Sequence, residues 1–134
     1  MASKKFLFVN RKAPYGTVYA LEALEVVLIA GAFEQQVSLA FLDDGVYQLL
    51  KNQRTTELGV KNFSPIYRAL GDYDITRLYV EIESLQERGL CVADLLPVTY
   101  DDVEDDFRQK SSLIAINREE MAVVMASHDI ILSF

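Results

Sequence analysis

Short, uninterrupted apolar segments alternate with segments of helical pattern along most of this chain. Strands that lack the polar alternation of a half-exposed sheet are typical of parallel sheets covered on both faces. Strands separated by helices are joined as βαβ units, which makes neighbouring strands parallel. The sequence therefore predicts an α/β fold, a single-domain three-layer α/β/α sandwich with a mainly parallel five-stranded sheet.

Five strands and several helices follow from this pattern. The expected strands are 5–10, 37–42, 77–82, 96–100 and 129–134. The expected helices are 17–30, 64–71, 84–89 and 121–126, with a helical turn at 46–50 and a loop at 51–62. Capping-box patterns, which satisfy free N–H groups at a helix start, occur at Ser84 with Glu87, Thr99 with Asp102 and Asn117 with Glu120.

The length and hydropathy favour one globular domain spanning 1–134. Of the 134 residues, 51% are apolar, which is enough for a hydrophobic core without disulfides. The longest apolar run, 26–33, is much shorter than a membrane-spanning helix. No basic-then-apolar signal peptide pattern opens the chain. We therefore expect a soluble, cytoplasmic protein.

The charge is distributed unevenly. The net charge is −7, with +1 over residues 1–54 and −8 over residues 55–134. Binding to DNA or RNA requires a basic surface that displaces counterions from phosphates. The acidic second part of the chain therefore argues against direct nucleic-acid binding.

The chain has one cysteine, Cys91, and one histidine, His128. A single cysteine forms no internal disulfide or Cys-x-x-Cys motif, and the two residues supply too few ligands for a metal site. Cys91 is expected just past a helix C-terminus, where the helix dipole disfavours a thiolate. We therefore expect a structural thiol at Cys91 and no catalytic role for His128.

Ligands of parallel α/β sheets bind beyond the carboxyl ends of the strands. The first such loop carries Arg11 and Lys12 before Gly16 and an expected helix N-terminus, a combination that can bind an anion. The chain lacks both glycine-rich phosphate motifs, so a plain turn or a partner contact is favoured.

Acidic residues mark the ends of the second and third expected strands. Asp43 and Asp44, with Glu81, could hold a magnesium ion, but loop capping before Gly45 is favoured. Glu81 and Glu83 would share one face of a strand. We expect both to be solvated carboxylates rather than a catalytic acid–base pair.

Five of the six residues from 101 to 106 are acidic. The favoured interpretation is a helix N-terminus stabilised by negative charge. The alternative is a docking face for a basic partner.

Several segments occur together in an order that is characteristic of one family. They are Ala13-Pro-Tyr-Gly-Thr17, Leu42-Asp-Asp-Gly-Val-Tyr-Gln-Leu49, Leu70-Gly-Asp-Tyr-Asp-Ile75, Ser84-Leu-Gln-Glu-Arg-Gly-Leu90 and the ending Asp129-Ile-Ile-Leu-Ser-Phe134. Over nearly its whole length the chain resembles the DsrE/DsrF-like family, and within it the DsrF/TusC branch. Asn10-Arg-Lys-Ala-Pro and Lys61-Asn-Phe-Ser-Pro65 look more like the DsrF members.

The resemblance implies a parallel α/β/α sandwich in a cytoplasmic heterohexamer of three related subunits, two copies each. Such a complex of the DsrEFH type relays persulfide sulfur in sulfur oxidation. It implies DsrE-like and DsrH-like sister subunits and a DsrC-like sulfur acceptor. The alternative is a TusC-like subunit of a TusBCD complex, which feeds 2-thiolation of a tRNA wobble uridine.

The family's sulfur-carrying cysteine lies on a sister subunit, after the third core strand, near the position of Val80 or Glu81 here. This chain has no cysteine there, and Cys91 comes about ten residues later. The resemblance therefore implies a non-catalytic subunit without a metal or cofactor. The candidate partner-site residues are Arg11, Lys12, Tyr15, Gly16, Asp43, Asp44 and Tyr47. Two other classes stay open: a stand-alone thiol enzyme using Cys91, and a receiver-like or nucleotide-binding module.

Overall fold

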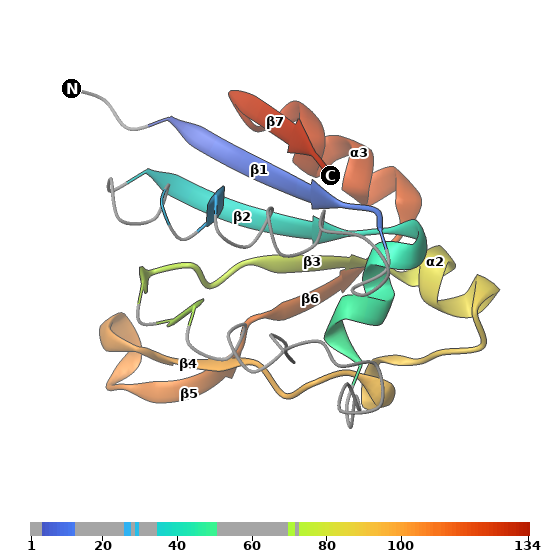
Figure 1. Ribbon diagram of the computed structural model, residues 1–134. Coiled ribbons are helices and arrows are strands. Elements are labelled where there is room, and N and C mark those ends of the chain that lie inside the picture. Colours follow the sequence, from blue (N-terminus) through green and yellow to red (C-terminus); the bar gives the residue numbers. More distant parts are fainter. Residues whose placement is uncertain (1–3, 13–25, 28, 30–34, 51–69, 72) are drawn as a thin grey trace, which may run out of the picture.

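A five-stranded parallel sheet forms the centre of the molecule (Figure 1). The computed structural model describes residues 4–12, 26–27, 29, 35–50, 70–71 and 73–134. The strands are β1 (Lys5–Asn10), β2 (Gln36–Phe41), β3 (Leu78–Glu81), β6 (Leu113–Ile116) and β7 (Ile130–Ser133). Their order is β6-β3-β2-β1-β7, and every neighbouring pair is parallel. The predicted parallel sheet is therefore confirmed.

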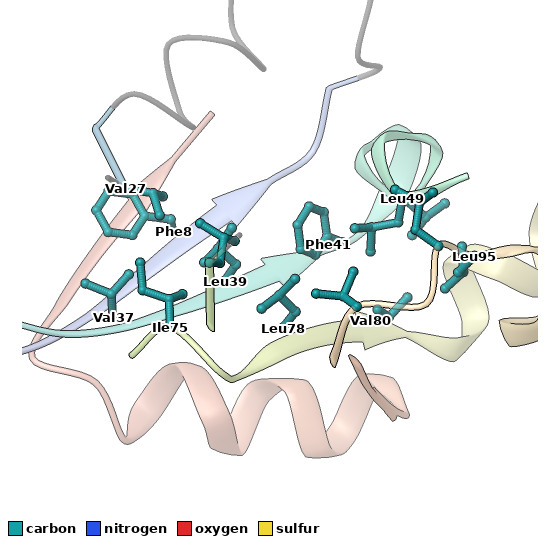
Figure 2. Close-up of a cluster of buried hydrophobic side chains, with 14 of the residues drawn as sticks. Phe8, Val27, Val37, Leu39, Phe41, Leu49, Ile75, Leu78, Val80 and Leu95 are labelled. Carbon is teal, nitrogen blue, oxygen red and sulfur yellow. The ribbon is translucent and has the colours of Figure 1, made fainter. Parts of the chain in front are cut away.

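Both faces of the central strands β1, β2 and β3 are buried, as the uninterrupted apolar runs predicted, whereas the edge strand β7 is largely exposed. Alternate side chains of a strand point to opposite faces, so Phe8 and Leu7 of β1 belong to two different clusters. The Phe8 cluster is the larger (Figure 2). Its strand members are Phe8, Val37, Leu39, Phe41, Leu78 and Val80, and members from outside the sheet include Val27, Leu49, Leu85, Leu95, Leu96 and Val98.

Helix α3 (Arg118–Ala126) covers the opposite face. Its Met121 packs with Leu7, Val9, Ala40 and Ile116. The predicted capping box is confirmed: the Asn117 side chain accepts from Glu120 N at 2.8 Å, and the Glu120 carboxylate accepts from Asn117 N at 3.1 Å. With buried clusters on both faces, the α/β/α arrangement is confirmed.

Further helical segments surround the sheet, and two of them reach the Phe8 cluster through Leu49 and Leu85. They include the 3₁₀ helices η1 (Asp43–Leu49), η4 (Val92–Asp94) and η5 (Val103–Asp105), and helix α2 (Ile82–Glu87). Helix α2 ends as predicted, because Gly89 takes the left-handed φ of 67° and Leu90 N donates to Leu85 O at 2.9 Å. Ser84, however, is not its N-cap. The helix begins two residues earlier, since strand β3 ends at Glu81 and the chain turns at once.

The expected sheet strand at 96–100 is wrong. Leu96 and Val98 are apolar because they are buried in the core beside the sheet. The chain continues into a separate antiparallel pair, β4 (Thr99–Asp102) and β5 (Arg108–Ser111). The strand that joins the parallel sheet is β6, whose four residues follow a polar segment too closely to stand out. The capping box predicted at Thr99 is wrong, because Thr99 lies in β4. The acidic run 101–106 holds no α-helix, but η5 begins within it, and the Asp102 side chain accepts from Glu104 N at its start.

Two expected helices, 17–30 and 64–71, and the expected loop 51–62 lie mostly or wholly outside the described residues. In the part of the chain that the structure describes, no helix is both long and apolar enough to cross a membrane.

Candidate functional site

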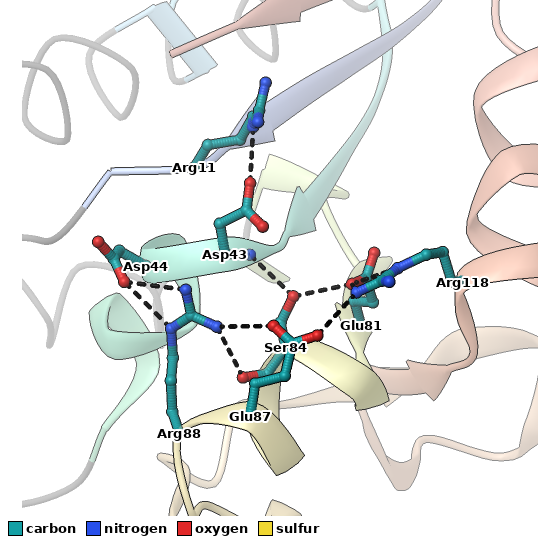
Figure 3. A network of polar contacts seen from close by, with 8 residues as sticks. All are labelled: Arg11, Asp43, Asp44, Glu81, Ser84, Glu87, Arg88 and Arg118. Atoms are coloured by element: carbon teal, nitrogen blue, oxygen red, sulfur yellow. Dashed lines mark hydrogen bonds and ion pairs between the residues drawn. The ribbon is translucent and has the colours of Figure 1, made fainter.

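Polar side chains gather at the carboxyl-terminal edge of the sheet, where four parallel strands end (Figure 3). Arg11 directly follows strand β1, Asp43 and Arg118 come two residues after the ends of β2 and β6, and β3 ends at Glu81. Parallel strands bring these loops to one edge although they lie far apart in the sequence. We call the eight residues drawn in Figure 3 the edge network: Arg11, Asp43, Asp44, Glu81, Ser84, Glu87, Arg88 and Arg118.

Glu81 is the buried centre of the edge network. The residue is only 4% exposed, which corrects the expectation of a solvated carboxylate. Its Oε1 accepts hydrogen bonds from the Ser84 hydroxyl at 2.9 Å and from Arg118 Nε and Nη2 at 3.2 and 2.9 Å. The side-chain hydrogen bond to Glu81 raises the pKa of Arg118, and a second one to Glu87 adds to it. A buried carboxylate requires such partners because removing a charge from water is costly.

Ser84 joins Glu81 to the second loop. Its hydroxyl donates to Glu81 and accepts from the backbone N–H of Asp43 at 2.8 Å. Asp43 adopts a left-handed φ of 51°, a conformation that aspartate tolerates better than bulkier residues. The fully buried Ser84 therefore fixes a turn that the backbone alone would not favour.

The outer part of the edge network consists of exposed ion pairs. Arg11 Nε lies 2.9 Å from Asp43 Oδ2, and Arg88 Nη2 lies 3.0 Å from Asp44 Oδ1. Arg88 also donates to Ser84 O at 3.1 Å, and its guanidinium lies 6.0 Å from the centre of the Tyr47 ring. Arg88 therefore ties α2 to η1 while its side chain is only 18% exposed.

Gly45 allows the loops after β1 and β2 to meet. A Cβ atom at this position would fall inside the carbonyl group of Asn10. Asn10 itself is buried, and its side-chain amide donates to Phe8 O and Ala40 O at 3.1 and 3.4 Å. The side chain of Gln48 donates to Lys12 O at 2.9 Å. The end of β1 and Lys12 are thus in contact with η1.

The ion pairs of the edge network bear on two possibilities that the sequence raised, a magnesium site and acid–base catalysis. Each carboxylate that could have formed a magnesium site is paired with an arginine: Asp43 with Arg11, Asp44 with Arg88 and Glu81 with Arg118. Among the described residues, no group of three His, Cys, Asp or Glu side chains is placed to hold a metal. A carboxylate engaged by a guanidinium is also a poor general base, because the ion pair stabilises its charged form.

Four of the predicted site residues meet at this edge: Arg11, Asp43, Asp44 and Tyr47. Lys12 contributes its backbone carbonyl, whereas Tyr15 and Gly16 lie outside the described residues. Sequence reasoning missed Ser84, Arg88 and Arg118. Arg118 was missed because the sequence pattern did not reveal strand β6. That strand places the start of α3 beside the end of β3.

Cys91 lies apart from the edge network, at the start of η4. Its side chain is exposed, and its Sγ donates to Asp94 Oδ2 at 3.4 Å. Cys91 follows the C-terminal end of α2, as expected, but it is also the N-cap of the three-residue helix η4.

The fold and sequence match known proteins. The chain is 50% identical over 131 residues to the intracellular sulfur oxidation protein DsrF of Allochromatium vinosum, covering 98% of this chain and 96% of that protein. It is 38% identical over 96 residues to a TusC homologue of Vibrio vulnificus, covering 72% and 80%. The crystal structure of the ychN protein from E. coli shares the fold, with a TM-score of 0.74 at 20% identity over 98% and 99% of the two chains. The family model described as DsrE/DsrF-like matches residues 4–125, and the chain belongs to this family.

Proposed function

We propose that this protein is a non-catalytic structural subunit of a cytoplasmic, heterohexameric sulfur-relay complex of the DsrEFH type. The observation that carries the proposal is the identity of the residue at the C-terminal end of strand β3. Where the family resemblance implies a sulfur-carrying cysteine in a sister subunit, this chain has Glu81, buried and bound by Ser84 and Arg118. No group at this position can accept sulfur as a persulfide.

The choice of the DsrEFH type over the TusBCD type is supported by similarity. Identity to the DsrF relative is 50% over nearly the whole chain, against 38% over a shorter stretch for the TusC homologue. The proposed sister subunits are DsrE-like and DsrH-like, and the proposed acceptor is DsrC-like.

In this proposal the edge network and its neighbours serve a partner subunit rather than a substrate. The proposed contact residues are Arg11, Lys12, Tyr15, Gly16, Asp43, Asp44 and Tyr47. Arg11 is 55% exposed despite its ion pair with Asp43. A guanidinium at an interface would lower the pKa of a neighbouring partner thiol and so raise its thiolate fraction.

The test is native mass spectrometry of complexes purified through this chain, followed by mass analysis of each subunit after treatment with a persulfide donor. We expect two related small subunits to co-purify and the added sulfur to appear on one of them. A Cys91→Ser variant should transfer sulfur at the wild-type rate within the complex. A chain that purifies alone and gains sulfur on Cys91 would overturn the proposal.

The pathway requires a separate readout. Sulfur that moves from the complex to a DsrC-like acceptor supports the sulfur-oxidation assignment. Loss of 2-thiouridine from tRNA in a deletion strain would instead assign the chain to the thiolation pathway.

A further inference from the structure

The β4–β5 hairpin adds little to the core of the molecule. Its strands form their own two-stranded sheet and lie apart from the parallel sheet (Figure 1). None of the residues from 99 to 111 is buried. A two-stranded hairpin gains little stability on its own, and the residues that the structure describes do not supply the burial that would stabilise its turn.

The turn of this hairpin exposes two large apolar side chains. Val103 is 69% exposed and Phe107 is 66% exposed. Phe107 has a left-handed φ of 58°, which is unfavourable for a bulky L-residue, and it follows Asp106 at 52°. The strained backbone at Phe107 therefore presents a ring that is largely exposed to solvent.

Specific contacts hold the turn in this conformation. Phe107 N donates to Asp102 O at 2.9 Å, which closes the turn. Lys110 Nζ lies 2.6 Å from Asp102 and 3.2 Å from Asp105, so one lysine binds two of the five acidic side chains. These contacts fix Val103 and Phe107 in an ordered, outward-facing pair.

The charged side chains around Val103 and Phe107 indicate which kind of partner this surface fits. Asp101, Glu104 and Asp106 have no ion-pair partner among the residues that the structure describes. A second copy of this chain carries a net charge of −7 and is therefore a poor electrostatic match for this acidic turn. Charge complementarity therefore favours a different protein with lysines or arginines around an apolar hollow.

We propose that Val103 and Phe107 form a docking surface for a partner protein that offers an apolar pocket rimmed by basic side chains. The aromatic ring is the anchor, and the three unpaired carboxylates orient the approach. This inference rests on the proposed function, in which the chain works only as part of a complex, and it adds a contact at the β4–β5 hairpin, outside the edge network.

The experiment compares Phe107→Asn and Val103→Asn with a matched control, Val123→Asn, in the full-length chain. Val123 is 70% exposed on α3. Asparagine tolerates the left-handed region, so Phe107→Asn keeps the turn and removes the ring. We expect unchanged or higher thermal stability for Phe107→Asn, and a Kd for the co-purified sister subunits weakened about tenfold or more, as for an interface anchor. The control should bind like wild type.

A triple variant tests the electrostatic part. Asp101→Asn, Glu104→Gln and Asp106→Asn together should slow association and flatten its dependence on salt. Wild-type Kd for Phe107→Asn in a complex that does form would overturn the docking inference and leave the proposed function intact. If the wild-type chain captures no related subunit, the proposed function fails first and the docking surface fails with it.

Discussion

Arg118, the first residue of α3, donates two hydrogen bonds to Glu81, the last residue of β3. The two residues are 37 positions apart, and the ion pair spans the gap between neighbouring parallel strands β3 and β6. The backbone N–H of Arg118 also donates to both carboxylate oxygens of Glu83, at 3.0 and 2.9 Å. The start of α3 is therefore anchored on two acidic residues of the β3–α2 junction.

Ser84→Ala tests whether the buried hydroxyl holds this junction together. The substitution leaves the N–H of Asp43 without its acceptor and removes one donor from Glu81. We expect a loss of about 1–3 kcal/mol in the free energy of unfolding, the usual cost of unsatisfied buried groups. Urea unfolding measures it. Ser133→Ala, at an exposed serine in β7, is the control and should change stability by less than about 0.5 kcal/mol. Equal effects at both positions would contradict a structural role for Ser84.

Gly45→Ala tests the contact between the first two loops. The new Cβ would collide with the backbone carbonyl of Asn10, which has no flexible end that could move away. We expect destabilisation of about 3 kcal/mol or more, at the upper end for overpacked sites. Gly89→Ala is the matched comparison, because its new Cβ has open space and meets only the left-handed φ of 67°, a penalty of about 1–2 kcal/mol. Differential scanning calorimetry of both variants gives the order, and a milder effect at Gly45 than at Gly89 would refute the steric argument.

The parts of this fold that could be predicted from the sequence are those with local signals. Strand β1 has the predicted bounds, and the Asn117–Glu120 capping box marks the start of α3 correctly. Each depends on residues close together in the chain, where periodicity and capping chemistry act directly.

The predictions failed where contacts between distant parts of the chain determine the structure. The apolar Leu96 and Val98 fill the core without joining the sheet, so burial was mistaken for a strand. The solvated Glu81 of the prediction is buried because Arg118 reaches it from a strand that the pattern did not reveal. The rule that ligands bind beyond the carboxyl ends of parallel strands did place Arg11 and Asp43 at the correct edge of the sheet. That rule depends only on the parallel topology.

The stability contributed by Glu83 should depend on pH in the acid range. Hydrogen bonds from the backbone N–H of Arg118 are the main cause that holds the pKa of Glu83 below its usual 4.5. Because the folded-state pKa is the lower one, the stabilisation is fully present above pH 4.5 and is lost as the pH falls through the lowered value. The Tm of wild type should therefore exceed that of Glu83→Gln by a constant amount near neutral pH. This difference should shrink as the pH falls into the acid range.

The control for this pH dependence is Glu119→Gln. Glu119 lies in the first turn of α3, as Glu83 lies in the first turn of α2, but Glu119 is exposed and accepts no such bond from a described backbone N–H. It shares the helix-dipole interaction alone, so its gap in Tm should be smaller at neutral pH. A Tm difference between wild type and Glu83→Gln that grew as the pH fell would contradict the expected pH dependence.

Asp44→Asn separates assembly from folding. The Asp44 side chain is 59% exposed and its ion pair with Arg88 is a surface one, so the substitution should change the free energy of unfolding by less than about 1 kcal/mol. If this loop contacts a sister subunit as proposed, the same variant should weaken assembly or slow sulfur transfer by the partner, because Arg88 and the Tyr47 ring beside it lose their orientation. Chemical unfolding and native mass spectrometry of the same sample measure the two effects. Glu119→Gln, exposed at the start of α3, controls for loss of surface charge. Wild-type assembly and wild-type transfer rates for Asp44→Asn, with the fold intact, would remove this loop from the proposed partner site.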